Sequence, residues 1–406
     1  MSSCHMKTAV NRAIERVHVF DLSGTFFSAP TTRCILNRLA AENLDITVFT
    51  KKRKESLRSF NGVEVRPYPV RWNGWVGDLR TTVRQMREFL QCWKAAIRPA
   101  PALAKPDLMV GINFTGVISA HQESKRNGVP FAYLSYELLF KNELTRAGQR
   151  REKQDEITAS RQAGLIVIQD EWRARLLAEE NGIALDRMTY LPVSPAGPCT
   201  LERTDYLRQR LPIPREKSIV LISGSFMTWT CAEEIIASVR SWPDDLVLVV
   251  NTYYKQSSAD TAIKRLRSVA ETRGNIHILN SPLENDEMEQ MVRSADVGLV
   301  LYKATYQASL VGKNIEVMGL SSGKLSTYLK NGLPVVCGGN SVLPDFLRQY
   351  RFGEYVDPRD DLVAALRKVL TDRETYSRQS ARFFQHRLDF DLFWPEVRRK
   401  TMALVE

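Results

Sequence analysis

The clearest chemistry in the sequence lies in residues 319–336, GLSSGKLSTYLKNGLPVV. A loop of small residues, Ser321-Ser322-Gly323, leads into a short predicted helix that begins near Lys324. Serine caps helices, glycine lets a ligand approach the backbone, and the free N–H groups and dipole at a helix start attract anions. The dipole disfavours a lysine there unless an anion is bound. The segment therefore predicts either a phosphate-binding loop or an ordinary capped helix with a solvated lysine.

Two glycine turns follow predicted strands, one in each half of the chain. Gly224-Ser225 follows the strand predicted at 217–223, and Gly24-Thr25 follows the strand predicted at 16–22. Such turns can bring backbone N–H groups against phosphate, although a plain tight turn is the alternative for each of them. Neither turn completes the Gly-x-Gly-x-x-Gly pattern of a dinucleotide site, which disfavours a dehydrogenase.

A carboxylate, Glu137, follows the apolar strand predicted at 130–134. At the end of a strand it can act as a base or hold hydroxyl groups, or it can simply begin a helix. The six cysteines and five histidines are scattered, without a Cys-x-x-Cys pair or a His-Glu-x-x-His motif. We therefore predict reduced cysteines and no metal site.

Short apolar runs alternate with helical patterns along the 406 residues, which predicts an α/β protein with parallel sheets. The strands expected in the first half are 16–22, 45–50, 107–111, 130–134 and 165–169. Those expected in the second half are 217–223, 246–251, 275–279, 296–302 and 334–337. A proline-rich joint at 191–198, LPVSPAGP, separates the halves. The pattern predicts two open-sheet domains that bind ligands at the carboxyl ends of their strands, in the cleft between the sheets.

The 319–336 segment resembles the Ser-Gly-Lys-Leu … Tyr-Leu … Gly-x-Pro-Val element of GT-B glycosyltransferases, especially glycosyltransferase family four. Looser matches follow in order along residues 16–375, among them IQDEWRARLL at 168–177, YLP at 190–192, ISGS at 222–225 and SADVGL at 294–299. The resemblance implies two Rossmann-like domains facing across a cleft, with an acceptor-binding domain at 1–195 and a nucleotide-sugar-binding domain at 196–378. Residues 379–406 would form a C-terminal helix that crosses back to the first domain.

The resemblance also assigns roles to individual residues. The donor-binding set is a glycine turn, a loop near the nucleobase and a phosphate-facing loop: Gly224, Ser225, Asn280, Leu283, Ser321, Ser322, Gly323 and Lys324. Many retaining members carry two glutamates eight positions apart, and this chain has Gly319 and Thr327 at those positions. Thr327 then stands at the ribose position, and Glu316 is the nearest substitute for the first acid. Glu137 and Glu316 are the catalytic candidates, and Gly24 and Thr25 lie on the acceptor side.

The implied activity is that of a retaining, hexosyltransferase-type enzyme. It would move a sugar from a UDP- or GDP-linked donor to a glycan or lipid-linked acceptor in cell-envelope or polysaccharide biosynthesis. Helix starts and basic side chains hold the diphosphate in such enzymes, so neither a metal nor a cofactor is expected. The alternative within the fold is a nucleotide-sugar epimerase. A nucleic-acid-binding protein would fit the net charge of +11, but the chain has no recognisable nucleic-acid motif, and no such partner is expected.

Residues 72–98, WNGWVGDLRTTVRQMREFLQCWKAAIR, predict a basic amphipathic helix after a tryptophan-containing loop. The helix can simply cover the first sheet, or it can dock the acceptor domain on an anionic membrane surface. No apolar run is long enough to span a bilayer, and the first 16 residues lack the apolar core of a secretory signal. We expect a cytoplasmic protein, with peripheral contact at the inner face of the membrane as the sharper hypothesis.

Overall fold

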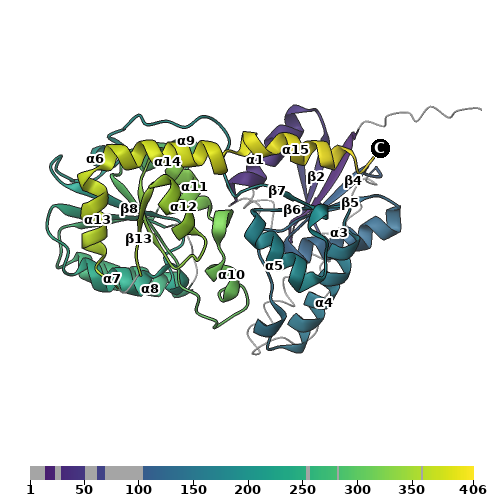
Figure 1. The fold of residues 1–406 in the computed structure, drawn as a ribbon, viewed down its shortest axis with the longest axis horizontal. Helices are drawn as coiled ribbons and strands as arrows, with labels where there is room; N and C mark the ends of the chain where they lie inside the picture. The colour runs from purple at the N-terminus through teal and green to yellow at the C-terminus, as the bar shows by residue number, and fades with distance from the viewer. Residues whose placement is uncertain are drawn as a thin grey trace, which may run out of the picture.

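The computed structural model describes residues 14–22, 29–50, 62–68, 104–252, 257–280, 283–357 and 360–406. Gly24, Thr25 and the basic segment 72–98 lie outside the described residues. Figure 1 shows two α/β units along the long axis of the molecule, with the C-terminal helices running from one unit to the other.

The N-terminal unit is built on a seven-stranded sheet with the strand order β3-β2-β1-β4-β5-β6-β7. Every pairing between these strands is parallel. The strands are β1 (Arg16–Phe20), β2 (Asp45–Thr50), β3 (Val63–Pro67), β4 (Leu108–Ile112), β5 (Phe131–Leu134), β6 (Leu165–Ile168) and β7 (Met188–Tyr190). The helices of this unit are α1 (Pro30–Ala41), α3 (Asn113–Asn127), α4 (Ala147–Gln162) and α5 (Glu171–Asn181). Apolar clusters cover both faces of the sheet, as a parallel sheet requires.

The C-terminal unit repeats the design on a six-stranded parallel sheet with the order β10-β9-β8-β11-β12-β13. Its strands are β8 (Ser218–Ser223), β9 (Leu246–Asn251), β10 (Ile276–Leu279), β11 (Val297–Leu301), β12 (Val335–Gly338) and β13 (Gly353–Tyr355). Its helices are α6 (Tyr206–Arg210), α7 (Ala232–Val239), α8 (Ser257–Ala270), α9 (Asn285–Arg293), α10 (Lys313–Glu316), α11 (Gly323–Lys330), α12 (Leu343–Tyr350) and α13 (Leu362–Thr371).

The predicted α/β class with parallel sheets is confirmed, and each strand expected from the sequence overlaps an observed strand. Three observed strands, β3, β7 and β13, had no sequence prediction. The predicted domain boundary at residue 195 falls between β7 and β8, whereas the boundary at residue 378 falls inside α14 (Arg373–Arg387).

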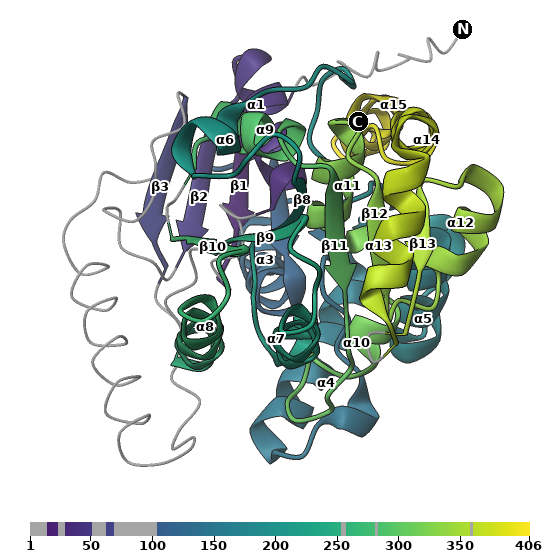
Figure 2. The same ribbon diagram turned by 90° about the vertical axis from the view of Figure 1, so that its left-hand side faces the viewer.

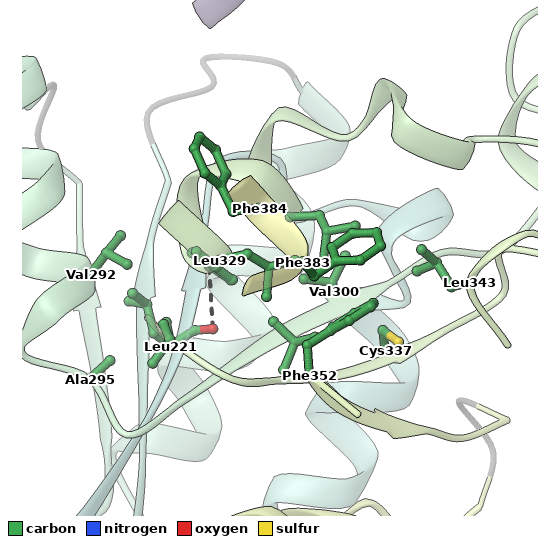
Figure 3. Close-up of a cluster of buried hydrophobic side chains, with 14 of the residues drawn as sticks. Leu221, Val292, Ala295, Val300, Leu329, Cys337, Leu343, Phe352, Phe383 and Phe384 are labelled. Atoms are coloured by element: carbon green, nitrogen blue, oxygen red, sulfur yellow. Dashed lines mark hydrogen bonds between the residues drawn. The ribbon is translucent and has the colours of Figure 1, made fainter. Parts of the chain in front are cut away.

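The two C-terminal helices connect the units. Figure 3 shows Phe383 and Phe384 of α14 buried among side chains of the C-terminal core, close to Leu329 of α11. The next helix, α15 (Phe390–Met402), places Trp394 and Val397 in the apolar cluster on one face of the N-terminal sheet. In Figure 1 the two helices lie end to end along the upper edge of the molecule. The chain therefore anchors one of these helices in each unit.

Two broader features follow from the described residues. None of their helices has the length and apolar character needed to cross a bilayer. The four cysteines among them form no disulfide: Cys231 and Cys337 are buried, and Cys34 and Cys199 are half-buried.

Candidate functional site

The carboxyl ends of the C-terminal strands carry most of the residues that the sequence singled out. The helix α11 begins there, and its N-cap is Ser322, whose hydroxyl accepts a hydrogen bond from the Leu325 N–H at 3.1 Å. Asn331 and Gly332 end the helix, Gly332 with a positive φ of 61°. The capped helix predicted from serine, glycine and asparagine signals is confirmed. Its first N–H groups point away from the helix body, as they do at any helix start.

Lys324, in the first turn of α11, is a half-buried cation without a counter-charge. Within the described part of the chain, its side chain has no hydrogen-bond or ion-pair partner. Burial lowers the pKa of its ammonium group to about 8. The helix dipole acts in the same direction, because it disfavours a positive charge at a helix start. An anion bound here would relieve both costs.

Aromatic side chains tie the start of α11 to the neighbouring strands. The Tyr328 hydroxyl accepts a hydrogen bond from the Ser223 N–H at 2.7 Å, at the end of β8. The Tyr302 and Ser322 hydroxyls are 2.5 Å apart, and the Tyr302 ring stacks on Trp229 with a centroid distance of 6.1 Å. These contacts hold the turn after β8, the end of β11 and the start of α11 together as one edge.

The glycine turn after β8 leaves space at this edge. Gly224 has a φ of 90°, and a Cβ built on it would meet no atom of the described residues within 4 Å. Ser225 is half-buried beside it, and its carbonyl accepts a hydrogen bond from the Thr230 hydroxyl. The nucleobase candidates lie further along the sheet after β10, where Asn280 is exposed and Leu283 packs partly against the core.

A second cation stands at the end of β11. Lys303 pairs with Glu234 on α7, with 2.6 Å between Nζ and Oε1, and its side chain remains 50% exposed. The other carboxylate oxygen of Glu234 is buried without a hydrogen-bond partner among the described residues. Sequence reasoning missed Lys303, since a lysine after a strand is an ordinary surface residue unless the neighbouring elements are known.

Two further candidates, Thr327 and Glu316, lie on either side of this loop. The Thr327 hydroxyl donates to the Gly323 carbonyl at 2.7 Å, so it is engaged within the helix. Glu316 is an exposed carboxylate at the end of α10, and the Tyr306 hydroxyl donates to it at 2.6 Å. Tyr306 has a φ of 53°, an uncommon conformation for a bulky residue. The carboxylate raises the pKa of the Tyr306 hydroxyl to about 12.

Glu137 lies in a buried polar junction between the two units rather than at the edge of the second sheet. Its carboxylate accepts a hydrogen bond from the Asn314 amide of α10 at 2.6 Å. The Asn314 carbonyl oxygen in turn accepts from the Leu138 N–H and from the Arg173 guanidinium, at 2.9 and 3.0 Å. Burial raises the pKa of Glu137, and the Arg173 charge and the Asn314 hydrogen bond oppose that shift. In Figures 1 and 2, α10 accordingly lies beside α5.

The same junction holds the loop that leads to Lys324. The Asp170 carboxylate caps α5 through the Arg173 N–H at 2.8 Å and accepts from the Leu320 N–H of the second unit at 2.9 Å. The Leu320 carbonyl accepts from the Val193 N–H at 3.0 Å. Ser321 donates through its hydroxyl to the Tyr136 carbonyl at 3.3 Å. The N-terminal unit thus shapes the phosphate-loop candidate directly.

The start of α11 also packs closely on the first unit. A Cβ on Gly323 would lie 3.3 Å from both Pro30 and Val193, so the glycine permits this approach. Sequence reasoning did not assign Asp170, Arg173 or Asn314 to a site. The only signal for the first two was their place in the IQDEWRARLL match, and Asn314 gave none.

Comparisons with known proteins rest on structure. Neither a protein-family model nor a curated protein sequence matches the chain. A sucrose-phosphate synthase from Thermosynechococcus elongatus superposes with a TM-score of 0.68 at 13% identity, over 96% of this chain and 99% of that one. HepE of Anabaena, solved in complex with UDP-glucose, has a TM-score of 0.68 at 12% identity, over 96% and 99%. WaaG, a glycosyltransferase involved in lipopolysaccharide biosynthesis, has a TM-score of 0.59 at 14% identity, over 94% and 98%.

The chain has the GT-B fold. At these identities the likeness shows the GT-B architecture, and the roles of individual residues must come from this chain itself. Membership of glycosyltransferase family four stays a prediction. Within the described residues, no group of three or more His, Cys, Asp or Glu side chains could hold a metal ion.

Proposed function

We propose that this GT-B protein is a glycosyltransferase that binds a nucleotide diphosphate sugar at the carboxyl edge of its C-terminal sheet. The observation that carries the proposal is Lys324, a half-buried ammonium group without a counter-charge among the described residues, at the start of a capped helix. A diphosphate supplies the missing negative charge and accepts hydrogen bonds from the helix N–H groups. The structural neighbour HepE was solved with UDP-glucose, which supports a donor of this class.

The shape of the edge suits such a ligand. The open space at Gly224 lies beside the Lys324 helix, since the Ser223 N–H is bonded to the Tyr328 hydroxyl of that helix. Lys303 lies at the end of the neighbouring strand β11, where it is paired with Glu234 and its side chain remains half exposed. We infer that the diphosphate lies between Gly224 and Lys324, with Asn280 and Leu283 on the nucleoside side. Lys324 and the helix N–H groups can bind the diphosphate without a metal.

The acceptor is assigned to the N-terminal unit. Glu316 is exposed and oriented by Tyr306, so it is free to meet a sugar hydroxyl or to act as a base. Glu137 is bonded to Asn314 inside the junction, which favours a role in positioning α10. We retain both as candidates for the transfer step. Gly24 and Thr25 remain the acceptor-side candidates from the sequence.

The finer assignments extend this proposal. A hexose donor linked to UDP or GDP, retention of configuration, and a glycan or lipid-linked acceptor of the cell envelope are supported by the sequence resemblance. Peripheral attachment to the inner face of the membrane is supported by the basic pattern of residues 72–98. The expected location is the cytoplasm.

A thermal-shift panel of UDP-, GDP- and dTDP-sugars tests the central proposal. A ligand that binds only the folded state adds about 2.7 kcal/mol of stability at 100 times its dissociation constant, so one sugar nucleotide should raise Tm by several degrees. The responding donor is then incubated with and without candidate acceptors in EDTA, and the products are separated by chromatography and identified by mass spectrometry. Flat responses across the panel would contradict a donor site. Conversion of the donor, without an acceptor, into an isomer of unchanged mass would instead identify an epimerase.

A further inference from the structure

Two consecutive buried residues at the carboxyl end of β9 carry oxygen atoms without partners. Asn251 and Thr252 are each 3% exposed. The side-chain oxygens Asn251 Oδ1 and Thr252 Oγ1 have no hydrogen-bond partner within the described part of the chain. A buried polar atom left without a partner costs stability, so native proteins rarely keep one without a reason.

The backbone around these oxygens continues the ladder between the strands. Asn251 lies opposite Ser223 on one neighbouring strand and Leu279 on the other. Its carbonyl accepts from the Gly224 N–H at 2.9 Å, and the Thr252 N–H donates to the Leu279 carbonyl at 3.1 Å. The unpartnered atoms are therefore confined to the side chains, in a part of the sheet whose strand ladder is regular.

Asn251 lies on the same face of the sheet as α11. Alternate residues of a strand share a face, and Val247 and Val249 belong to the apolar cluster that contains Leu325 and Tyr328 of α11. Asn251 extends this row of side chains to the carboxyl end of β9. In the order β10-β9-β8-β11, β9 is two strands from β11, or about 10 Å at the usual strand spacing. That separation is comparable to the one between the base and the terminal phosphate of a nucleoside diphosphate.

We propose that Asn251 binds the nucleoside of the donor, with its side-chain oxygen accepting a hydrogen bond from a base N–H or a ribose O–H. This inference rests on the proposed function. An uncharged amide oxygen repels a phosphate oxygen, so the phosphates belong to Lys324 and the nucleoside to Asn251. Thr252 is the next residue along the chain and so belongs to the opposite face of the strand, and the proposal therefore rests on Asn251.

The chain provides a matched control in the same sheet. Asn275 precedes β10, is also 3% exposed, and also has an unpartnered Oδ1. Its amide nitrogen, however, donates to the Leu246 carbonyl at 3.0 Å, at the amino end of β9. Asn275 therefore lies at the opposite edge of the sheet from Lys324, and its side chain serves the fold.

The experiment measures binding of UDP, GDP, dTDP and ADP to the full chain by calorimetry, for wild type, Asn251→Leu, Asn275→Leu and Lys324→Ala. We expect Asn251→Leu to weaken the best nucleotide at least tenfold without lowering the Tm of the ligand-free protein, because it removes an unpartnered buried oxygen. Asn275→Leu should lower Tm and leave affinity unchanged. Asn251→Ser serves as the second variant if the leucine variant does not fold, and Thr252→Val tests the neighbouring hydroxyl.

Four outcomes separate this inference from the proposed function. No binding of any nucleotide to wild type overturns both. Weaker binding in Lys324→Ala with wild-type binding in Asn251→Leu overturns only the nucleoside role. An equal loss of affinity in Asn251→Leu and Asn275→Leu also overturns the nucleoside role of Asn251, because the loss would then reflect a general disturbance of the sheet. If the tenfold loss occurs, the affinities of wild type and Asn251→Leu for UDP and 2′-deoxy-UDP are compared. If wild type prefers UDP and Asn251→Leu does not, Asn251 contacts the ribose. If both proteins prefer UDP equally, Asn251 contacts the base.

Discussion

Lys153 and Lys324 occupy opposite kinds of environment in this molecule. Lys153 of α4 is 1% exposed, and its ammonium group lies 2.9 Å from Glu156 Oε2 and 2.7 Å from Asn181 Oδ1. The Tyr133 hydroxyl completes the cluster by donating to Glu156 at 3.0 Å. Lys324 is half-buried and has no acid partner in the described chain. Neighbouring side chains of the protein therefore balance the charge of Lys153, whereas no described residue balances the charge of Lys324.

The same contrast separates two larger regions. In the junction between the units, the carboxylates of Glu137 and Asp170, the Arg173 guanidinium and the Asn314 amide all have protein partners. At the carboxyl edge of the C-terminal sheet, Lys324, Asn251 and Thr252 lack them within the described residues. We interpret the saturated junction as structural and the unsatisfied groups at the strand ends as the proposed ligand site.

We expect the largest effect, on the free energy of unfolding, from replacing Lys153, the lysine that has its partners. Lys153→Ala leaves Glu156 buried and unpaired, and losing one partner of a buried ion pair costs about 3–5 kcal/mol in the free energy of unfolding. Urea denaturation followed by circular dichroism measures the change. The variant that remains folded should bind the donor nucleotide as wild type does. Unchanged stability would show that the Lys153–Glu156 pair does not stabilise the fold.

Lys324→Ala should give the opposite result, a loss of donor binding without a loss of stability. A charge-assisted contact with phosphate contributes about 1.5–3 kcal/mol, so affinity for the donor nucleotide should fall roughly ten- to a hundredfold. Stability should stay the same or rise slightly, since a desolvated charge disappears from a helix start. Titration calorimetry and urea denaturation of the same preparation give both numbers. Donor binding at wild-type strength would remove the phosphate role from Lys324.

The pH dependence of binding sharpens the assignment. With its pKa lowered to about 8 in the free protein, Lys324 loses its proton as the pH rises from 7 to 9. The phosphates of UDP and GDP are largely ionised across this interval, because the second ionisation of a terminal phosphate lies at about pH 6. Affinity for UDP or GDP should therefore fall by up to about tenfold across this interval, in the direction that linkage requires for a bound proton. The slope should be absent in Lys324→Ala, and a variant that keeps it would assign the titration to another group.

Much of the fold could be predicted because its signals are local. Apolar runs such as 246–251 are typical of strands in a covered sheet, and residue types alone indicate the Ser322 cap and the Gly332 stop. The strands that escaped prediction are all at sheet edges: β3, β7 and β13. Edge strands are short and partly exposed, so β3, with the sequence VEVRP, lacks a continuous apolar run.

The candidate site was predicted only in part, for a related reason. Ser322 and Lys324 act through the helix they begin, so local pattern was enough to select them. Asn251 looks like any polar residue at a strand end, and only the three-dimensional structure shows its oxygen without a partner. Asn314 meets Glu137 and Leu138 across more than 170 residues of sequence. No local spacing encodes such a contact, and the junction between the units is built from contacts of this kind.

We expect the smallest effect from a change in the junction between the units. It tests whether the hydrogen bonds of the junction influence donor binding at the carboxyl ends of the C-terminal strands. Asp170→Asn keeps a good helix cap, because asparagine and aspartate cap equally well. It replaces one carboxylate oxygen by an amide group that cannot accept, so either the Arg173 N–H or the Leu320 N–H loses its partner. The control is Asp361→Asn, which changes the cap of α13 at the Val363 N–H, outside the junction.

The lost hydrogen bond is worth about 0.5–1.5 kcal/mol. Leu320 stands directly before Ser321–Lys324, so part of that energy should reach the phosphate loop. We expect Asp170→Asn to weaken donor nucleotide binding about twofold to fivefold by calorimetry, and Asp361→Asn to leave it unchanged. Equal affinities in the two variants would show that the loop keeps its conformation without the N-terminal unit. A selective loss in Asp170→Asn would show that closing the two units helps to assemble the donor site, so that a fully partnered junction also contributes to function.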